Sequence, residues 1–128
     1  MDRHSLRENS MVCIYQNLLV NKSINETILD VFESVEIDGF AQMLIDKSIT
    51  NKERYIGYIN NVMSEYSFDR LGYIEQALLL MGCSEFDAQT APASVIIDEY
   101  ILLAKKYCDD DAYKLINSVL DRIWVKKY

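Results

Sequence analysis

Apolar residues recur at intervals of three and four along nearly the whole chain, and this periodicity constrains the fold more than any other feature. An α-helix turns once every ~3.6 residues, so this spacing gathers apolar side chains on one face. Ile24, Ile28, Val31, Phe32 and Val35 form one such stripe. No stretch alternates apolar and polar residues as a half-buried strand does. The spacing therefore predicts an all-α fold, with short loops between the helices.

Breaks between the periodic segments divide the chain into about seven helices. The first is expected over residues 5–20 and the fifth over residues 72–86. The sequences "SINE" at Ser23 and "TNKE" at Thr50 match the capping box that begins a helix. Pro92 lacks an amide hydrogen and fits a loop or a first turn. The aspartates at 109–111 provide an N-cap and favourable charge for the last helix.

Composition places the chain among cytoplasmic proteins with one domain. At 128 residues it can bury a core without disulfides. Its three cysteines, Cys13, Cys83 and Cys108, are odd in number and widely spaced, which favours reduced core thiols over a disulfide framework. No apolar run is long enough to span a membrane, and no signal peptide is recognisable. We therefore expect a cytoplasmic protein that does not insert into membranes.

The residue types that carry catalysis are nearly absent. The chain has one histidine, His4, near its amino terminus. This argues against a zinc site with several histidine ligands and against a catalytic Cys–His pair within the helices. Asp98 and Glu99 are neighbours in the sequence, and a helix points neighbouring side chains ~100° apart, so these two carboxylates cannot easily share a substrate. The aspartates at 109–111 lack the spaced oxygen ligands of a calcium loop. We expect no catalytic residues, no metal site, no cofactor and no enzymatic activity.

The formal net charge of −7 argues against a general nucleic-acid binder, because an acidic surface repels phosphate. Residues 24–46 contain six acids and no Lys or Arg. The basic residues gather elsewhere: Arg3, Arg7, Lys105, Lys106, Arg122, Lys126 and Lys127. If these segments converge in space, a local basic patch can form on an acidic body. The alternative is that the charge serves solubility alone.

Three blocks of sequence resemble the NusB family of bacterial transcription antitermination factors. The first is "RHSLRENSMVCIYQ" at residues 3–16, and the second is "IEQALLLMGCSEF" at residues 74–86. The third is an ordered set over about thirty residues: Pro92, "VIIDEY", "AKKY", "DDDAYK" and "LINSVLDRI". The third block is the most specific, and together the blocks span nearly the whole chain.

The resemblance implies seven helices in two small packed bundles, within one domain over residues 1–128. We expect subdomains at roughly 1–66 and 67–128. It also implies a non-enzymatic factor that binds boxA, a single-stranded RNA element of ribosomal RNA leaders. The factor would act with NusE, a ribosomal small-subunit protein, to help assemble an antitermination complex on RNA polymerase.

The resemblance also assigns site residues where the sequences match. The expected RNA contacts are Arg3, His4, Arg7, Asp111, Lys114 and Leu115. The expected NusE contacts are Tyr15 and Glu75, and the acidic block at 24–46 would help attract a basic partner. Without the resemblance, these residues could be a solvated terminus, a helix cap and ordinary helix surface. We further expect Arg3 and Arg7 to lie beside Asp111 and Lys114 on one small surface.

Departures from the family pattern leave other functions open. Gln76 and Leu80 replace family arginines, and Leu115 replaces a frequent Phe that could stack on a base. RNA binding is therefore expected to be weak and to depend on the partner. One rival is a helical protein–protein module that has lost RNA binding. Another is the RNA-recruiting domain fused to some ribosomal RNA methyltransferases, although the sequence contains no catalytic domain. A homodimer formed through apolar residues of the first helix would hide the RNA surface.

Overall fold

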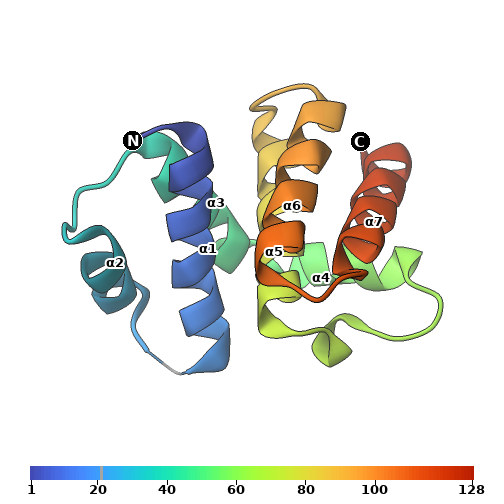
Figure 1. The fold of residues 1–128 in the computed structure, drawn as a ribbon, viewed down its shortest axis with the longest axis horizontal. Helices are drawn as coiled ribbons and strands as arrows, with labels where there is room; N and C mark the ends of the chain where they lie inside the picture. The colour runs from blue at the N-terminus through green and yellow to red at the C-terminus, as the bar shows by residue number, and fades with distance from the viewer. Residues whose placement is uncertain (21) are drawn as a thin grey trace.

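The computed structural model describes residues 1–20 and 22–128. Across these residues the chain forms seven α-helices and one short 3₁₀ helix, with no β-strand (Figure 1). The all-α prediction is confirmed. The elements are α1 (Arg3–Leu19), α2 (Ile24–Phe32), α3 (Gly39–Thr50), α4 (Lys52–Val62), η1 (Phe68–Arg70), α5 (Tyr73–Ala88), α6 (Ala93–Tyr107) and α7 (Ala112–Lys127).

Helix α5 is the centre of the packing. It contacts α1, α3, α4, α6 and α7. Every residue from Gln76 to Phe86 is buried, including three consecutive leucines, Leu78, Leu79 and Leu80. Apolar side chains on several faces of α5 need a neighbour on each face, and the buried polar residues Gln76, Ser84 and Glu85 are hydrogen-bonded within the protein, so α5 occupies a central position.

The other helices pack around α5 in two groups. Helices α2 and α3 pack against α1 on one side, and α6 and α7 pack against each other on the other side (Figure 1). The subdomain boundary near residue 66 stays a prediction. The structure adds that α4, which precedes that boundary, packs against α5 and α7.

Gly82 allows α5 and α7 to approach closely. A Cβ atom at this position would lie 2.6 Å from Cδ2 of Leu120, which is closer than real Cβ contacts. Leu120 is fully buried, so its side chain has little room to move away. The absence of a side chain at Gly82 therefore sets the distance between these two helices.

The predicted helix starts are close to the observed ones, but the predicted capping bonds are wrong. Ser23 and Asp111 occupy N-cap positions and make no side-chain capping bond. Thr50 is the last residue of α3, and Asn51 precedes α4. Asp111 has φ −102° and ψ −2°, whereas an N-cap side chain needs an extended backbone to reach the next turn. Asp38, which the sequence analysis did not single out, does cap its helix: it accepts from the Phe40 amide at 2.8 Å.

Candidate nucleic-acid and partner interface

Arg7 is a buried structural cation. Its side chain on α1 donates from Nε and Nη2 to the two carboxylate oxygens of Glu85 on α5, both at 2.8 Å. Arg7 is only 4% exposed and Glu85 is fully buried. Glu85 also accepts hydrogen bonds from the hydroxyls of Tyr100 and Thr90. Burial alone would lower the pKa of Arg7, but the bonds and charge of Glu85 outweigh it and raise that pKa.

Arg3 and His4 lie at the exposed start of α1. The Arg3 guanidinium donates from Nη1 to the Thr90 carbonyl at 3.2 Å and lies 4.5 Å from the centre of the Phe40 ring. His4 lies between two carboxylates, 3.5 Å from Glu8 and 3.7 Å from Glu99. Both predicted contacts are therefore accessible, whereas Arg7 one turn further along α1 is not.

Helices α1 and α6 meet along a line of polar side chains that we call the α1–α6 seam: His4, Glu8, Glu99, Lys106 and Tyr107. The Glu8 carboxylate bridges the two helices, because Lys106 Nζ and the Tyr107 hydroxyl both donate to its Oε2, at 2.6 and 2.5 Å. Lys106 stands out in the sequence as a basic residue, but its pairing with Glu8 does not. That contact joins residues 98 positions apart and has no local signature.

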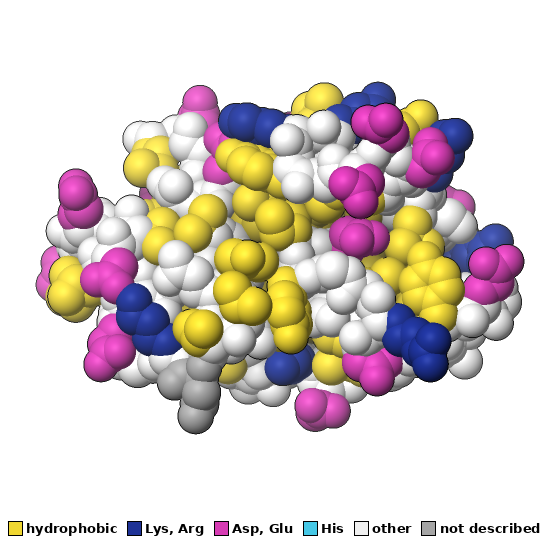
Figure 2. Space-filling model, turned by 60° about the horizontal axis from the view of Figure 1, so that its bottom comes forward, with side chains coloured by type: hydrophobic (Ala, Val, Ile, Leu, Met, Phe, Trp, Pro, Cys, Tyr) yellow, Lys and Arg dark blue, Asp and Glu magenta, His cyan; other side chains and the backbone are white. Residues whose placement is uncertain are grey.

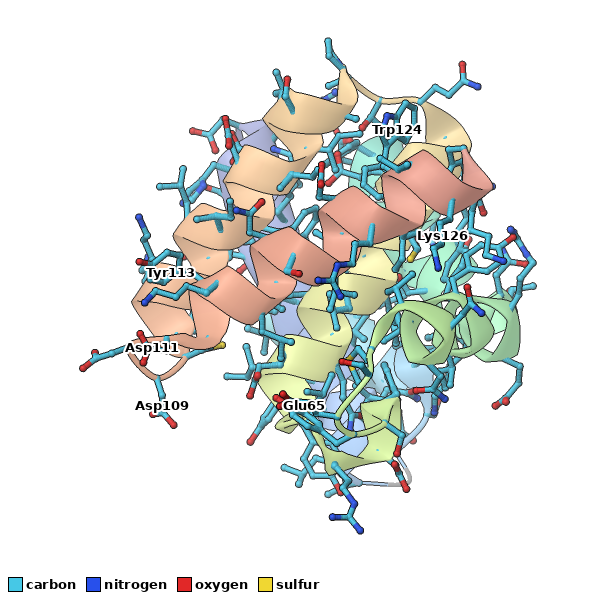
Figure 3. The ribbon with its side chains drawn as sticks, turned by 90° about the vertical axis from the view of Figure 1, so that its right-hand side faces the viewer. Glu65, Asp109, Asp111, Tyr113, Trp124 and Lys126 are labelled. Carbon is cyan, nitrogen blue, oxygen red and sulfur yellow. The ribbon has the colours of Figure 1, made fainter. Side chains whose placement is uncertain are left out.

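The seam leads to a second cluster, the acidic end: Tyr15, Glu75, Cys108, Asp109 and Asp111. Tyr15 and Glu75 line one shallow pocket with Tyr107, Cys108 and Asp109. A second pocket, which also contains Glu75 and Asp109, extends to Asp111 and Leu115. The two residues predicted to contact NusE are therefore near each other, and two of the predicted RNA contacts are next to them. Figure 3 shows Asp109 and Asp111 at the turn that begins α7, at the opposite end of that helix from Lys126.

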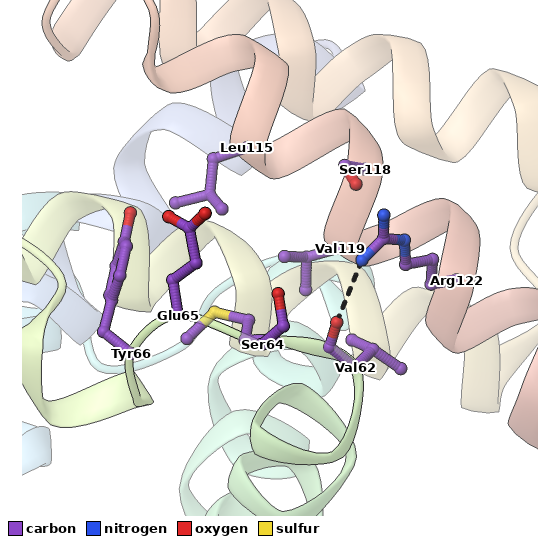
Figure 4. A pocket seen from close by; sticks show the side chains of 9 residues that line it. Val62, Ser64, Glu65, Tyr66, Leu115, Ser118, Val119 and Arg122 are labelled. Carbon is purple, nitrogen blue, oxygen red and sulfur yellow. Dashed lines mark hydrogen bonds between the residues drawn. The ribbon is translucent and has the colours of Figure 1, made fainter.

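Leu115 also lines a third pocket, of about 130 Å³, which is formed by residues of α7 and by the end of α4 with the segment that follows it. Figure 4 shows this pocket, with Glu65 and Tyr66 at one side and Arg122 at the other. Arg122 donates to the Val62 carbonyl at 3.2 Å, which ties α7 to the end of α4. The half-buried Leu115 is part of the wall between this pocket and the one at Asp111. Lys114 is exposed and lies 3.3 Å from Asp111.

The prediction that Arg3 and Arg7 lie beside Asp111 and Lys114 is wrong. Arg3 and Arg7 bond to Thr90 and Glu85, at the end of α5, whereas Asp111 lies near Glu75 at its start. Glu75 and Glu85 are ten residues apart on α5, so the separation is roughly 15 Å. The reason is that α6 runs back along α5 before the turn to α7 (Figure 1). The start of α1, with Arg3 and His4, and the acidic end are therefore the two ends of an extended surface along the α1–α6 seam.

The acidic end combines negative charge with exposed apolar side chains. Tyr66 and Tyr73, which line its two pockets, are each 43% exposed. Figure 2 shows this side of the molecule, with hydrophobic side chains gathered near its middle and both acidic and basic ones around them. Apolar surface rimmed by charge is typical of a protein interface, and this charge suits a basic partner.

Other kinds of site find little support in the described part of the chain. Within residues 1–20 and 22–128, no group of three or more His, Cys, Asp or Glu side chains is placed to hold a metal ion. None of the helices described is long and apolar enough to cross a membrane. Cys13, Cys83 and Cys108 are free thiols. Burial raises the pKa of Cys13 to about 12 and is the main cause of the rise to about 11 at Cys108.

Comparison with known proteins decides the family. The NusB family model matches residues 4–124. The chain belongs to the NusB family. A transcription antitermination protein NusB from Exiguobacterium is 30% identical over 96% of this chain and 97% of its own length. The NusB of Bacillus subtilis is 27% identical over 96% of this chain and 95% of its own length.

Solved NusB structures share the fold. One, a complex of NusB and NusE with double-stranded RNA, has a TM-score of 0.84 and 26% identity, covering 96% of both chains. The NusB of Aquifex aeolicus in solution has a TM-score of 0.79 and 26% identity, covering 96% of this chain and 87% of that one. The helices that the structure describes over residues 1–20 and 22–128 are therefore arranged as in the NusB family.

Proposed function

We propose that this NusB-family chain is a transcription antitermination factor that binds boxA-type leader RNA together with NusE. In this role it is a non-enzymatic adaptor in the cytoplasm that helps to assemble an antitermination complex on RNA polymerase. The observation that carries the proposal is the likeness, over nearly the full chain, to proteins named for antitermination, one of them solved with NusE and RNA.

The geometry supports separate regions for the partner and for RNA along the extended surface. The acidic end, with Tyr15 and Glu75, binds the basic partner through charge and aromatic contact. Arg3 and His4 contribute to RNA binding at the other end, and Lys114 and Leu115 contribute beside the acidic end. Asp111 cannot attract phosphate, so its role is to accept hydrogen bonds from base or sugar. Arg7 acts by fixing α1 against α5 instead of touching RNA.

This arrangement predicts weak RNA binding by the chain alone. Arg3 and Tyr15 are twelve residues apart on α1, so the surface is roughly 18 Å long and carries few free cations. For about three phosphate contacts to a single strand, the logarithm of affinity changes with the logarithm of salt concentration with a slope of only about −2. The partner is therefore expected to supply much of the affinity.

A titration tests the proposal. Labelled single-stranded boxA RNA is titrated with the chain, with and without NusE, at low and moderate salt, and anisotropy is measured. A double-stranded RNA of the same sequence is a second ligand, because the solved relative holds double-stranded RNA. Arg3→Ala is expected to weaken binding and to make the salt slope shallower by about 0.7, the value for one phosphate contact. Lys126→Ala, at the far end of α7, is the matched control and should change little.

Saturable binding that NusE strengthens and Arg3→Ala weakens supports the proposal. Tight NusE binding with no RNA binding under any of these conditions contradicts it and favours the protein–protein module. A homodimer stays a prediction, which scattering can test: a monomer of this length should have a radius of gyration of roughly 14 Å.

A further inference from the structure

The contact between Glu8 and α6 is unusually well formed for the surface of a protein. Both donors converge on one oxygen, Oε2, and the Glu8 side chain is only 18% exposed. Lys106 and Tyr107 also interact with each other, since Lys106 Nζ lies 5.2 Å from the centre of the Tyr107 ring. The bond from Lys106 is the main reason that the pKa of Glu8 is lowered.

An ammonium group and a phenol hydroxyl aimed at one anionic oxygen also make a good arrangement for phosphate. Both are hydrogen-bond donors, and a charge-assisted bond to a phosphate oxygen has the same geometry as one to a carboxylate oxygen. The Lys106 side chain is 57% exposed, so a ligand can approach it from solvent.

The contact lies between the two ends of the extended surface. Glu8 is one turn beyond His4 on α1, and Tyr107 lines a pocket with Tyr15 and Glu75. RNA that reaches from the start of α1 to the acidic end has to pass over Glu8 and Lys106. A carboxylate at that point repels the RNA backbone unless it moves.

We propose that Lys106 Nζ and the Tyr107 hydroxyl form a phosphate-binding site for RNA, which the Glu8 carboxylate occupies in the free protein. An RNA phosphate takes the place of the carboxylate, and the Glu8 side chain turns out into solvent. This inference rests on the proposed RNA-binding function. It adds a phosphate contact, together with a carboxylate of the same chain, Glu8, that competes with RNA for that contact. It accounts for part of the expected weak affinity, because RNA has to displace an existing ion pair.

Replacing Glu8 tests the competition. Glu8→Gln keeps the size of the side chain and removes its charge. Exposed ion pairs are worth up to ~1 kcal/mol, so RNA affinity of the complex with NusE is expected to rise about two- to fivefold. Asp121→Asn is the matched control: it removes one negative charge from an exposed side chain on α7 that lies near Ala93 and Ser94 at the start of α6, whereas Lys106 lies at the end of that helix. It should change affinity much less.

Replacing Lys106 tests the site itself. Lys106→Ala is expected to weaken RNA binding and to make the salt slope shallower by about 0.7, as for one lost phosphate contact. Lys106→Arg should retain binding. In the Lys106→Ala background, Glu8→Gln should lose most of its gain, since the carboxylate then has no ammonium to block. Tyr107→Phe, which keeps the ring and removes the hydroxyl, should reduce affinity less than Lys106→Ala.

The outcomes separate this inference from the proposed function. A gain with Glu8→Gln that exceeds the gain with Asp121→Asn, and that depends on Lys106, supports the site. Equal gains from the two variants, or an undiminished gain without Lys106, would overturn the site and leave the RNA-binding function standing. Absence of RNA binding by the unaltered complex would overturn both. Thermal unfolding of each variant checks that the fold is unchanged.

Discussion

At the scale of single residues, Arg7 shows how the same side chain can be interpreted in two ways. An arginine near an amino terminus, in a pattern shared with RNA-binding proteins, indicates a phosphate contact. In the structure its guanidinium is buried against Glu85, and the Tyr100 hydroxyl bonds to the same carboxylate. Glu85 lies 78 residues away in the sequence, so nothing local to Arg7 signals the pairing.

Arg7→Ala is therefore predicted to act on stability. The change leaves the Glu85 carboxylate buried without its cation, which typically costs about 3–5 kcal/mol. Urea unfolding followed by circular dichroism measures the loss. Arg3→Ala is the control, because Arg3 is exposed and its removal should cost less than about 1 kcal/mol. An Arg7→Ala protein with unchanged stability and lost RNA binding would instead make Arg7 a direct RNA contact.

At the scale of helices, the sequence determines which segments are helical better than it determines how they begin. Apolar periodicity depends on many residues together, so one exception does not hide it, and the seven α-helices described over residues 1–20 and 22–128 could all be predicted. A capping bond depends on the φ and ψ of one residue. Asp111 and Asn51 both have ψ close to zero, and neither side chain caps. The burial of α5 on every side could not be anticipated in full, because Gln76, Ser84 and Glu85 are buried among its leucines and Glu85 depends on the distant Arg7.

The contact between α5 and α7 gives a prediction at this scale. Gly82→Ala is expected to destabilise the fold by about 1–3 kcal/mol, because the new methyl group would overlap the buried Leu120 side chain. Gly57→Ala is the matched control on α4. Gly57 is exposed and a Cβ there would meet nothing within 4 Å, so this change should stabilise the helix by about 0.5–1 kcal/mol. Urea unfolding of both variants measures the difference, and equal effects would mean that Gly82 does not limit the helix approach.

At the scale of the whole molecule, the candidate site is an extended surface and not one basic spot. The residues at both ends of this surface could be named from the sequence, because the family resemblance assigns them. Their separation could not, because it depends on α6 running back along α5 (Figure 1). The role of Glu8 and Lys106 was also out of reach, since it requires two helices that meet only in the folded chain.

In the proposed complex, RNA lies along the α1–α6 seam while the basic partner covers the acidic end. Amide chemical shifts of the isotope-labelled chain in complex with NusE, recorded before and after RNA is added, test it most directly. NusE alone should shift the amide signals of Tyr15 and Glu75, and adding RNA should then shift those of Arg3, His4, Glu8 and Lys106. RNA-induced changes confined to α2, α3 or α4, with the seam unaffected, would contradict it.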